Sequence, residues 1–171
     1  MDLEKHIRSI PDWPKKGVIF RDIMPLLADK DAFAAAVQAI ADRYRDKKID
    51  YVAAVEARGF IFGSAVAANL GAGFVPIRKK GKLPFKTESI TYDLEYGQDT
   101  LEIQTDAMKK NSRVLVVDDL LATGGTMAAA CQLVEKIGGK ICGIAFLIEL
   151  KYLDGRSKIS KYDISVEITY E

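Results

Sequence analysis

The residue types best suited to chemistry are concentrated in residues 114–126, which read VLVVDDLLATGGT. An apolar run leads into Asp118 and Asp119, and a short loop then precedes a helical pattern. In an open α/β sheet, ligands bind beyond the carboxyl ends of the strands, where we expect these two carboxylates to lie. Carboxylate oxygens accept hydrogen bonds from sugar hydroxyls, and Mg²⁺ could share the same oxygens.

The loop after the two aspartates is suited to an anion. Thr123, Gly124, Gly125 and Thr126 lead into a helix, so backbone N–H groups and two hydroxyls can surround a phosphate. The loop lacks both the Gly-Lys-Thr ending of a Walker loop and the glycine spacing of dinucleotide-binding folds. One alternative is that the aspartates only cap the turn and the glycines only permit it. The combination of strand, acids, loop and helix favours a site for a phosphorylated sugar.

The charge balance argues against several other classes of protein. Lysine and arginine number 25 and aspartate and glutamate number 24. The chain therefore has no overall basic field for nucleic acid or for an anionic membrane. His6 is the only histidine, which argues against a serine–histidine triad and against a zinc site with several imidazoles. Catalysis is expected to use carboxylates, backbone groups and cations.

The cysteines and the start of the chain indicate a cytoplasmic location. Cys131 and Cys142 stand in apolar stretches and are expected to be buried free thiols, as in a reducing compartment. The first ten residues are charged, and the uncharged run 59–77 is interrupted by glycines, Asn69 and Pro76. We therefore expect neither a secretory signal nor a membrane span.

Strands and helices alternate along the chain, which predicts an α/β fold. Short apolar runs predict strands at 51–55, 73–77, 113–117 and 140–150, and a last strand, at an edge, within 162–169. Helical periodicity predicts a helix from Asp31 with an aspartate cap, a second helical segment that ends near Leu70, and a third at 126–139. Because the strands do not alternate strictly, we predict a doubly wound, mostly parallel central sheet with flanking helices.

Residues 1–171 are expected to form a single domain with two appendages. An N-terminal arm, residues 1–30, begins with Leu3, Ile7 and Ile10 at helical spacing and continues through a proline-rich stretch. Residues 78–104 contain a basic run and two alternating segments, SITYDLEY and TLEIQ, which predict a hairpin. Such a segment is uncommon in a compact domain unless it is a lid or a disordered insert. We interpret it as a flexible lid that forms a hood with the arm.

Five segments together resemble the type I phosphoribosyltransferases, and among them the adenine-specific branch. They are GVIFRDI, EARGFIFG, RKKGKLP, LEYG and VLVVDDLLATGGT, in the order found in that family. The resemblance implies that family's fold and a transferase of purine salvage. Adenine would be joined to 5-phospho-α-D-ribose 1-diphosphate, giving AMP and diphosphate. It also implies a homodimer, and Mg²⁺ bound mainly through the substrate diphosphate and the ribose hydroxyls.

The resemblance assigns roles at both ends of the sugar substrate. Asp118 and Asp119 would hold the ribose hydroxyls, with Asp118 counted as catalytic. The 5′-phosphate would lie against Ala122, Thr123, Gly124, Gly125 and Thr126.

A second segment would bind the diphosphate. Its residues are Glu56, Ala57, Arg58 and Gly59, where family members often carry a non-proline cis peptide bond. A fixed guanidinium, here the catalytic candidate Arg58, can offer two donors to phosphate oxygens. Basic residues that reach diphosphate in the family, partly across the dimer, correspond to Arg78, Lys79 and Lys82. Taken alone, Arg58 would fit a surface ion pair, and the other three a solvated charge run.

The adenine site is implied by the segment GVIFRD. The base would lie against Phe20, with backbone groups around Ile19 and Arg21 at its Watson–Crick edge. A carbonyl that accepts from the 6-amino group and an N–H that donates to N1 would reject hypoxanthine, because both would face mismatched groups. Phe20 could equally be a core residue, and Trp13 is assigned to packing.

In the segment LEYG, Glu95 resembles a lid carboxylate that approaches the purine imidazole edge and helps with the proton as N9 attacks. Tyr96 would pack beside the base. Hypoxanthine–guanine members of the family carry an aspartate where this loop has Ala122, so a carboxylate near N7 must come from elsewhere, and Glu95 is the catalytic candidate. The alternative is an ordinary exposed carboxylate on a hairpin.

Two other functions remain open from the sequence. One is a phosphoribosyltransferase for another purine. The other is a non-catalytic regulator that senses phosphoribosyl diphosphate. Such regulators usually need a nucleic-acid-binding surface, for which neither the near-zero net charge nor the length leaves obvious room.

Overall fold

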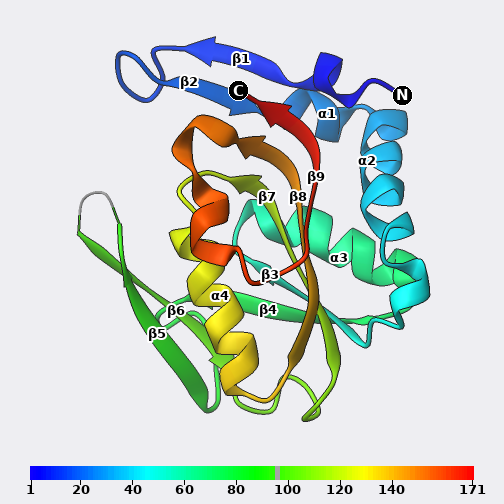
Figure 1. Cartoon of the computed structure of the whole chain (residues 1–171), viewed down its shortest axis with the longest axis vertical. Coiled ribbons are helices and arrows are strands. Elements are labelled where there is room, and N and C mark those ends of the chain that lie inside the picture. The colour runs from blue at the N-terminus through cyan, green and yellow to red at the C-terminus, as the bar shows by residue number, and fades with distance from the viewer. Residues whose placement is uncertain (95–96) are drawn as a thin grey trace.

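The computed structural model describes residues 1–94 and 97–171, and a seven-stranded sheet forms the centre of this part of the chain (Figure 1). In spatial order its strands are β5 (Thr87–Asp93), β6 (Gln98–Gln104), β4 (Gly73–Lys79), β3 (Tyr51–Val55), β7 (Arg113–Leu121), β8 (Lys140–Leu150) and β9 (Ile164–Tyr170). The five strands from β4 to β9 run parallel, whereas β6 and β5 form an antiparallel hairpin at one edge. The predictions of a mostly parallel sheet, a hairpin and a last edge strand are confirmed.

Helices cover both faces of the sheet (Figure 1). On one face pack α1 (Met24–Ala28), α2 (Lys30–Asp42) and α3 (Arg58–Leu70), and on the other packs α4 (Gly125–Lys136). Because helices cover both faces, residues of strand β7 are buried on both sides of the sheet. Val114 and Val116 belong to the core on the α4 side, and Leu115 and Val117 to the core on the side of α2 and α3. A central strand buried on both faces is uniformly apolar, which explains its run of four apolar residues.

Helix α2 begins one residue earlier than the sequence predicts. Its cap is Asp29, whose carboxylate accepts from the N–H groups of Asp31 and Ala32, each at 3.0 Å. This satisfies two of the N–H groups that have no partner in the first turn of the helix. Val37 and Ile40 of this helix are buried, as is Tyr44, which follows it at helical spacing.

The N-terminal arm contains a second, two-stranded sheet (Figure 1). Strand β1 (Arg8–Pro11) pairs antiparallel with β2 (Ile19–Asp22). The helical spacing at the start of the chain was therefore misleading. Only the 3-10 helix η1 (Leu3–His6) forms there, and Ile10 lies in β1 opposite Phe20. Three apolar residues are too short a pattern to separate helix from strand, and pairing with β2 decides the outcome.

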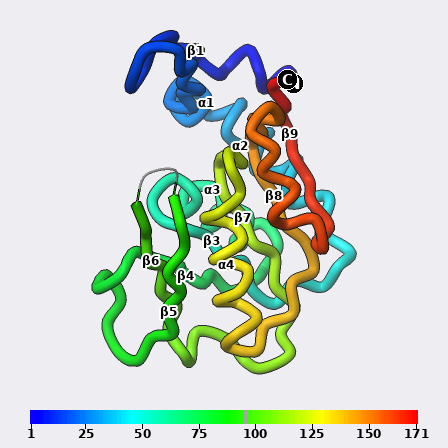
Figure 2. The backbone as a smooth tube through the Cα atoms, turned by 60° about the vertical axis from the view of Figure 1, so that its left-hand side comes forward, coloured from blue at the N-terminus to red at the C-terminus, as the bar shows by residue number. Residues whose placement is uncertain are grey.

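The β5–β6 hairpin extends from the sheet edge alongside α4 (Figure 2). After β8 the chain passes through the 3-10 helices η3 (Lys151–Leu153) and η4 (Gly155–Ile159), of which η4 contacts α4, and then enters β9. Both cysteines are free, as predicted. Only Cys131 is buried, however. Cys142 lies near the start of β8 and is partly exposed. In the described part of the chain, every helix is too short or too polar to cross a bilayer.

Candidate functional site

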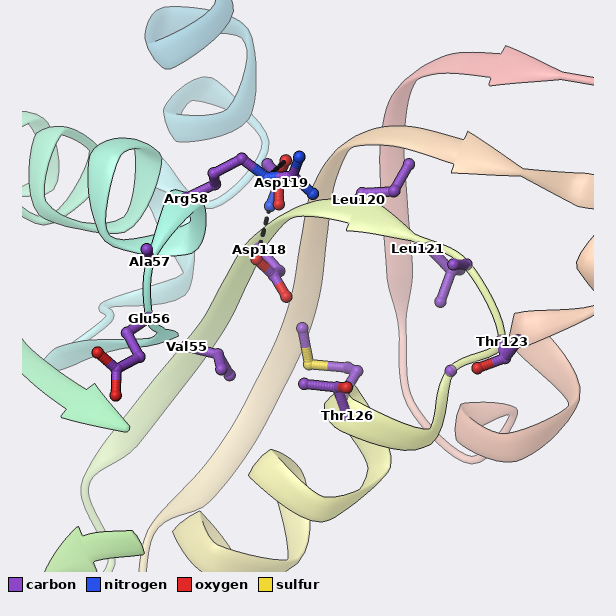
Figure 3. Close-up of a pocket in the computed structure, with 13 residues that line it drawn as sticks. Val55, Glu56, Ala57, Arg58, Asp118, Asp119, Leu120, Leu121, Thr123 and Thr126 are labelled. Carbon is purple, nitrogen blue, oxygen red and sulfur yellow. Dashed lines mark hydrogen bonds and ion pairs between the residues drawn. The ribbon is translucent and has the colours of Figure 1, made fainter. Parts of the chain in front are cut away.

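A cavity of about 330 Å³ opens at the carboxyl ends of β3 and β7 (Figure 3). Its lining residues are Val55, Glu56, Ala57, Arg58, Asp118, Asp119, Leu120, Leu121, Ala122, Thr123, Gly124, Thr126 and Met127. The two strands are adjacent and parallel, with Ala54 opposite Val117, so the segments that follow them meet at one edge of the sheet. The predicted diphosphate segment and the predicted sugar-phosphate segment therefore share one cavity.

Asp118 projects into this cavity from the end of β7 (Figure 3). Its Oδ1 accepts from the backbone N–H of Asp119 at 2.9 Å. A Cβ added to Gly59, the second residue of α3, would lie 2.6 Å from the same oxygen. The absence of a side chain at Gly59 therefore makes room for the carboxylate. Burial, and then the charge of Asp119, raise the pKa of Asp118 well above its ordinary value.

Asp119 points to the other side of the strand and is buried, with 5% of its surface exposed. Its Oδ2 lies 2.8 Å from Nε of Arg58 at the start of α3. Burial raises the pKa of Asp119, and the guanidinium of Arg58 offsets only part of that shift. The cavity thus contains two carboxylates with raised pKa values and one cation, so it is well supplied with acceptors for hydroxyl groups.

The loop from Ala122 to Gly124 forms the far wall of the cavity and leads into α4 (Figure 3). Gly124 has a φ of +80°, a conformation that favours glycine, and it precedes the helix without a side-chain cap. The first N–H groups of α4 are therefore available to an anion. Thr126 lines the cavity, and its Oγ1 lies 3.2 Å from the hydroxyl of Tyr92 in β5. Gly125 does not line the cavity itself but is the first residue of α4.

Glu56 follows β3 and joins Ala57 through a cis peptide bond, at the position where the family resemblance implies one. Its carboxylate accepts from the backbone N–H of Lys79 at 2.8 Å and from the guanidinium of Arg78 at 3.0 and 3.2 Å. Burial alone would raise the pKa of Glu56. The bonds from Lys79 and Arg78 outweigh that effect and lower it.

The three basic candidates of the predicted lid begin at the end of β4, where Arg78 and Lys79 are the last two residues of the strand. Besides its bonds to Glu56, Arg78 donates to the carbonyl of Lys82 at 3.1 Å. The ammonium of Lys79 pairs with Asp99 of β6 at 3.0 Å. None of these three basic residues lines the cavity. For Arg78 and Lys79, contact with an anion there would require exchange of Glu56 and Asp99 for it.

The predicted base-binding segment is β2. Phe20 faces Arg58, with 5.6 Å between Cζ and the ring centroid. Trp13 packs on Phe20 edge to face, with ring centroids 4.4 Å apart, although half of its surface remains exposed. Ile19 is exposed, and the guanidinium of Arg21 lies 3.6 Å from the ring centroid of Tyr170. Glu95 and Tyr96 lie outside the described residues.

Sequence reasoning missed some of the residues that shape the cavity. Its lining includes Val55, Leu121 and Met127. In addition, Gly155 in η4 packs against the loop from Ala122 to Gly124, since a Cβ on Gly124 would overlap the Gly155 carbonyl oxygen. Val55 belongs to a strand that was predicted from its apolar character alone, whereas Leu121 lies in the part of β7 beyond the predicted strand 113–117. Gly155 stands far from the loop in the sequence, and only the tertiary fold brings the two together.

Among the residues that line the cavity, Asp118 and Asp119 are adjacent carboxylates that could bind a metal ion. Within residues 1–94 and 97–171, no three histidine, cysteine, aspartate or glutamate side chains lie together as a metal-binding group. Asp118 and Asp119 could supply oxygen ligands to a hard cation that takes its remaining ligands from a bound substrate and water. This arrangement suits Mg²⁺, which is commonly held by one or two carboxylates together with substrate phosphates.

Comparison with known proteins gives a consistent result. Residues 26–170 match the family model of the phosphoribosyl transferase domain. The chain is 55% identical over 170 residues to the adenine phosphoribosyltransferase of Brachyspira hyodysenteriae, covering 99% of this chain and 100% of that protein. The crystal structure of the adenine phosphoribosyltransferase of Thermoanaerobacter pseudethanolicus superposes with a TM-score of 0.95 at 51% identity, covering 99% and 98% of the two chains. The Saccharomyces cerevisiae enzyme, complexed with adenine and a bisphosphate, superposes with a TM-score of 0.90 at 39% identity, covering 96% and 94%.

Proposed function

The chain belongs to the phosphoribosyl transferase family, and we propose that it joins adenine to phosphoribosyl diphosphate. The products are AMP and diphosphate, a reaction of purine salvage. N9 of adenine forms a bond to C1 of the ribose while the bond from C1 to the diphosphate oxygen breaks, and the proton on N9 is released. The observation that carries the proposal is one cavity that combines the Asp118–Asp119 pair, the loop before α4 and Arg58.

The sugar phosphate binds across the end of β7 in this proposal. Asp118 and Asp119 accept from the ribose hydroxyls, and the first N–H groups of α4, with the hydroxyls of Thr123 and Thr126, hold the 5′-phosphate. The helix dipole contributes up to about 2 kcal/mol, so direct hydrogen bonds must supply most of the affinity for the phosphate. The uncapped start of α4 and the left-handed φ of Gly124 support this assignment.

Departure of diphosphate leaves positive charge on the sugar and negative charge on the leaving group. In the proposal Arg58 stabilises the leaving group, because its guanidinium lies at the diphosphate segment and is fixed by Asp119. Arg78, Lys79 and Lys82 join it when the lid closes, after Arg78 has left Glu56 and Lys79 has left Asp99. Asp118 and Asp119 would help to hold Mg²⁺, which when bound would neutralise charge on the diphosphate.

Adenine recognition is assigned to β2. This strand pairs only with β1 in the described structure, so its other edge can offer backbone groups around Ile19 and Arg21 to the base. Adenine presents a donor at its 6-amino group and an acceptor at N1, and hypoxanthine reverses both. A mismatched base would leave buried groups of the protein without partners, which costs about 1–3 kcal/mol for each group. The position of Phe20 beside Arg58 supports a base site next to the sugar site.

Closure of residues 78–104 is proposed to exclude water that would otherwise hydrolyse the activated sugar. Glu95 is then the carboxylate that manages the purine proton, and Tyr96 packs beside the base. Glu95→Gln is expected to reduce kcat strongly while ribose 5-phosphate still binds. A Glu95→Gln enzyme as fast as the wild type would remove the proton role.

The assembly and the location of the protein are also proposals. A single domain, residues 1–171, is proposed to form a homodimer, in which basic lid residues reach partly into the neighbouring site. Light scattering during size-exclusion chromatography tests the dimer. The free thiols of Cys131 and Cys142 fit a reducing cytoplasm, and fractionation of the producing cell tests that location.

The proposed reaction is tested by a comparison of bases. The protein is mixed with Mg²⁺, phosphoribosyl diphosphate and, separately, adenine, hypoxanthine, guanine or xanthine, and nucleotide and diphosphate are measured by chromatography. We expect AMP from adenine and little product from the other bases. Product from another purine alone would reassign the base site. Binding of phosphoribosyl diphosphate without product from any base would favour a regulator that senses this metabolite.

A further inference from the structure

The segment from Gly155 to Ile159, which forms η4, packs directly on the proposed phosphate loop. A Cβ on Gly124 would overlap the carbonyl oxygen of Gly155, and a Cβ on Gly155 would overlap the carbonyl oxygen of Ala122. The two backbones therefore touch with no side chain between them. Ile159, at the other end of η4, is fully buried in the core beneath α4. The position of η4 relative to the loop is thus fixed at both ends.

An ion pair fixes the same segment to the sheet. The guanidinium of Arg156 donates to both carboxylate oxygens of Glu149, at 2.6 and 2.9 Å. Glu149 is buried, with 4% of its surface exposed, and lies in β8 opposite Leu121 of β7. A two-point guanidinium–carboxylate contact fixes direction as well as distance. Neither residue lines the cavity, so the pair orients η4 rather than a ligand.

Lys158 is the residue that η4 carries toward the start of α4. A Cβ placed on Gly125 would lie 3.9 Å from the Lys158 ammonium, so this cation is close to the first turn of α4. Lys158 is exposed and forms no hydrogen bond or ion pair with any other described residue. The lysines near it in sequence differ in this respect, since Lys151 pairs with Glu171 and Lys161 pairs with Glu135.

The charges around the cavity indicate a role for Lys158. Asp118, Asp119 and Glu56 all line the cavity, whereas Arg58, its one lining cation among the described residues, is paired with Asp119. A phosphate held at the start of α4 would lie near these carboxylates with no lining cation of its own. Lys158 does not line the cavity either, but its ammonium is close to the first turn of α4 and would offset that repulsion once a phosphate is bound there.

We propose that Lys158 is a further substrate-binding residue, which donates from its ammonium to the 5′-phosphate of the sugar. The inference rests on the proposed function for the identity of that phosphate. Gly155 and Arg156 act as positioning residues, since they place η4 and with it the lysine. The ligand class is a phosphate monoester on the primary hydroxyl of a pentose, and the same contact serves the substrate and the product AMP.

The test compares ligands that differ only in this phosphate. Binding of AMP, ribose 5-phosphate and adenosine is measured by calorimetry for the wild type, Lys158→Ala, Lys158→Arg and the matched control Lys161→Ala. Loss of one charged hydrogen bond at an exposed position is expected to weaken AMP and ribose 5-phosphate about tenfold in Lys158→Ala. Adenosine binding should not change. Lys158→Arg should recover most of the loss, and Lys161→Ala should behave as the wild type.

Steady-state kinetics provides a second readout. In Lys158→Ala the KM for phosphoribosyl diphosphate should rise about tenfold, while the KM for adenine stays within about twofold. Unchanged affinity for AMP and ribose 5-phosphate would overturn the inference and leave the proposed function intact. An equal loss for adenosine would overturn it too, because the effect would then be structural. A wild-type protein that binds no ribose 5-phosphate would overturn both the inference and the proposed function.

Discussion

Arg58 and Asp119 form an ion pair across the wall of the cavity, with 2.8 Å between Nε and Oδ2. The side chain of Asp119 is 7% exposed and that of Arg58 is 35% exposed. Asp119 is therefore removed from water, whereas Arg58 still faces the solvent and the cavity. The pair holds the guanidinium at the proposed diphosphate segment, and it leaves the outer face of Arg58 available to an anion.

The first prediction concerns removal of this cation. Arg58→Ala leaves the buried carboxylate of Asp119 without a partner, and the free energy of unfolding of this variant should fall by about 1–2 kcal/mol. This is less than for a fully buried pair, because solvent already screens Arg58. Urea denaturation measures the change. Adding Asp119→Asn to Arg58→Ala should restore stability, since no buried charge is left, but activity should stay at least about 100-fold low. A double variant that is less stable than Arg58→Ala would contradict the argument.

The second prediction concerns pH and Asp118. Burial raises the pKa of Asp118 in the folded protein above its value in the unfolded chain. Ionisation therefore opposes folding, and the cost is fully present above the folded pKa and disappears as the pH falls to the ordinary carboxyl value. Asp118→Asn should be more stable than the wild type at neutral pH, by roughly 0.5–2 kcal/mol, and the difference should shrink on acidification. Thermal unfolding across a pH series measures it.

Activity should move in the opposite direction in the same variant. The amide introduced by Asp118→Asn cannot offer two carboxylate acceptors to the ribose hydroxyls, so kcat/KM should fall by about 100-fold or more. A variant that gains stability and loses activity would mark Asp118 as a residue kept for function. Equal activity would remove Asp118 from the site. A stability difference that grows on acidification would show that its pKa is not raised.

The third prediction uses two glycines of α3. In Gly59→Ala the new Cβ would lie 2.6 Å from Oδ1 of Asp118. That atom ends a short side chain, which can turn away, so stability should change by less than about 1 kcal/mol, but kcat should fall by about tenfold or more. In Gly63→Ala the Cβ would meet Ala54 Cβ at 2.5 Å and Phe74 at 3.2 Å in the core. Overpacking there should cost about 1–3 kcal/mol while the folded enzyme keeps its kcat.

The two variants are controls for each other. Denaturation curves and kcat, measured on the same preparations, should show a loss of kcat in Gly59→Ala and a loss of stability in Gly63→Ala. If both variants lost kcat equally, the contact between Gly59 and Asp118 would have no special role in the site.

The sheet could be predicted from the sequence because its central strands are buried on both faces. A run such as 113–117 or 140–150 is apolar for that reason, and a helix on each side follows from the alternating pattern. Asp118, Asp119 and the glycine loop could be placed because they come directly after such an apolar run, although β7 itself continues through both aspartates to Leu121. Parallel strands have their carboxyl ends at one edge, which explains why the segment after β3 lies nearby.

Other features depend on contacts between distant segments. The contact of Gly155 with Gly124 joins residues with no shared motif, and the partners of Arg78 and Lys79 depend on how β4 lies between β3 and β6. The arm was harder still, because its few apolar residues fit a helix and a strand equally well. There the pairing of β1 with β2, a tertiary outcome, decides the structure.

The last prediction concerns the proposed base site at Phe20. Stacking of a base on an aromatic ring contributes about 1–3 kcal/mol, so Phe20→Ala should raise the KM for adenine roughly tenfold and leave that for phosphoribosyl diphosphate unchanged. Phe20→Tyr keeps a ring and should stay near the wild type. Trp13→Ala removes the ring that packs on Phe20 at 4.4 Å and should have a smaller effect on the same KM. Phe20 also lies 5.6 Å from Arg58, so a purely structural role is a real alternative. In that case Phe20→Ala would lower stability and kcat together without a selective change in the KM for adenine.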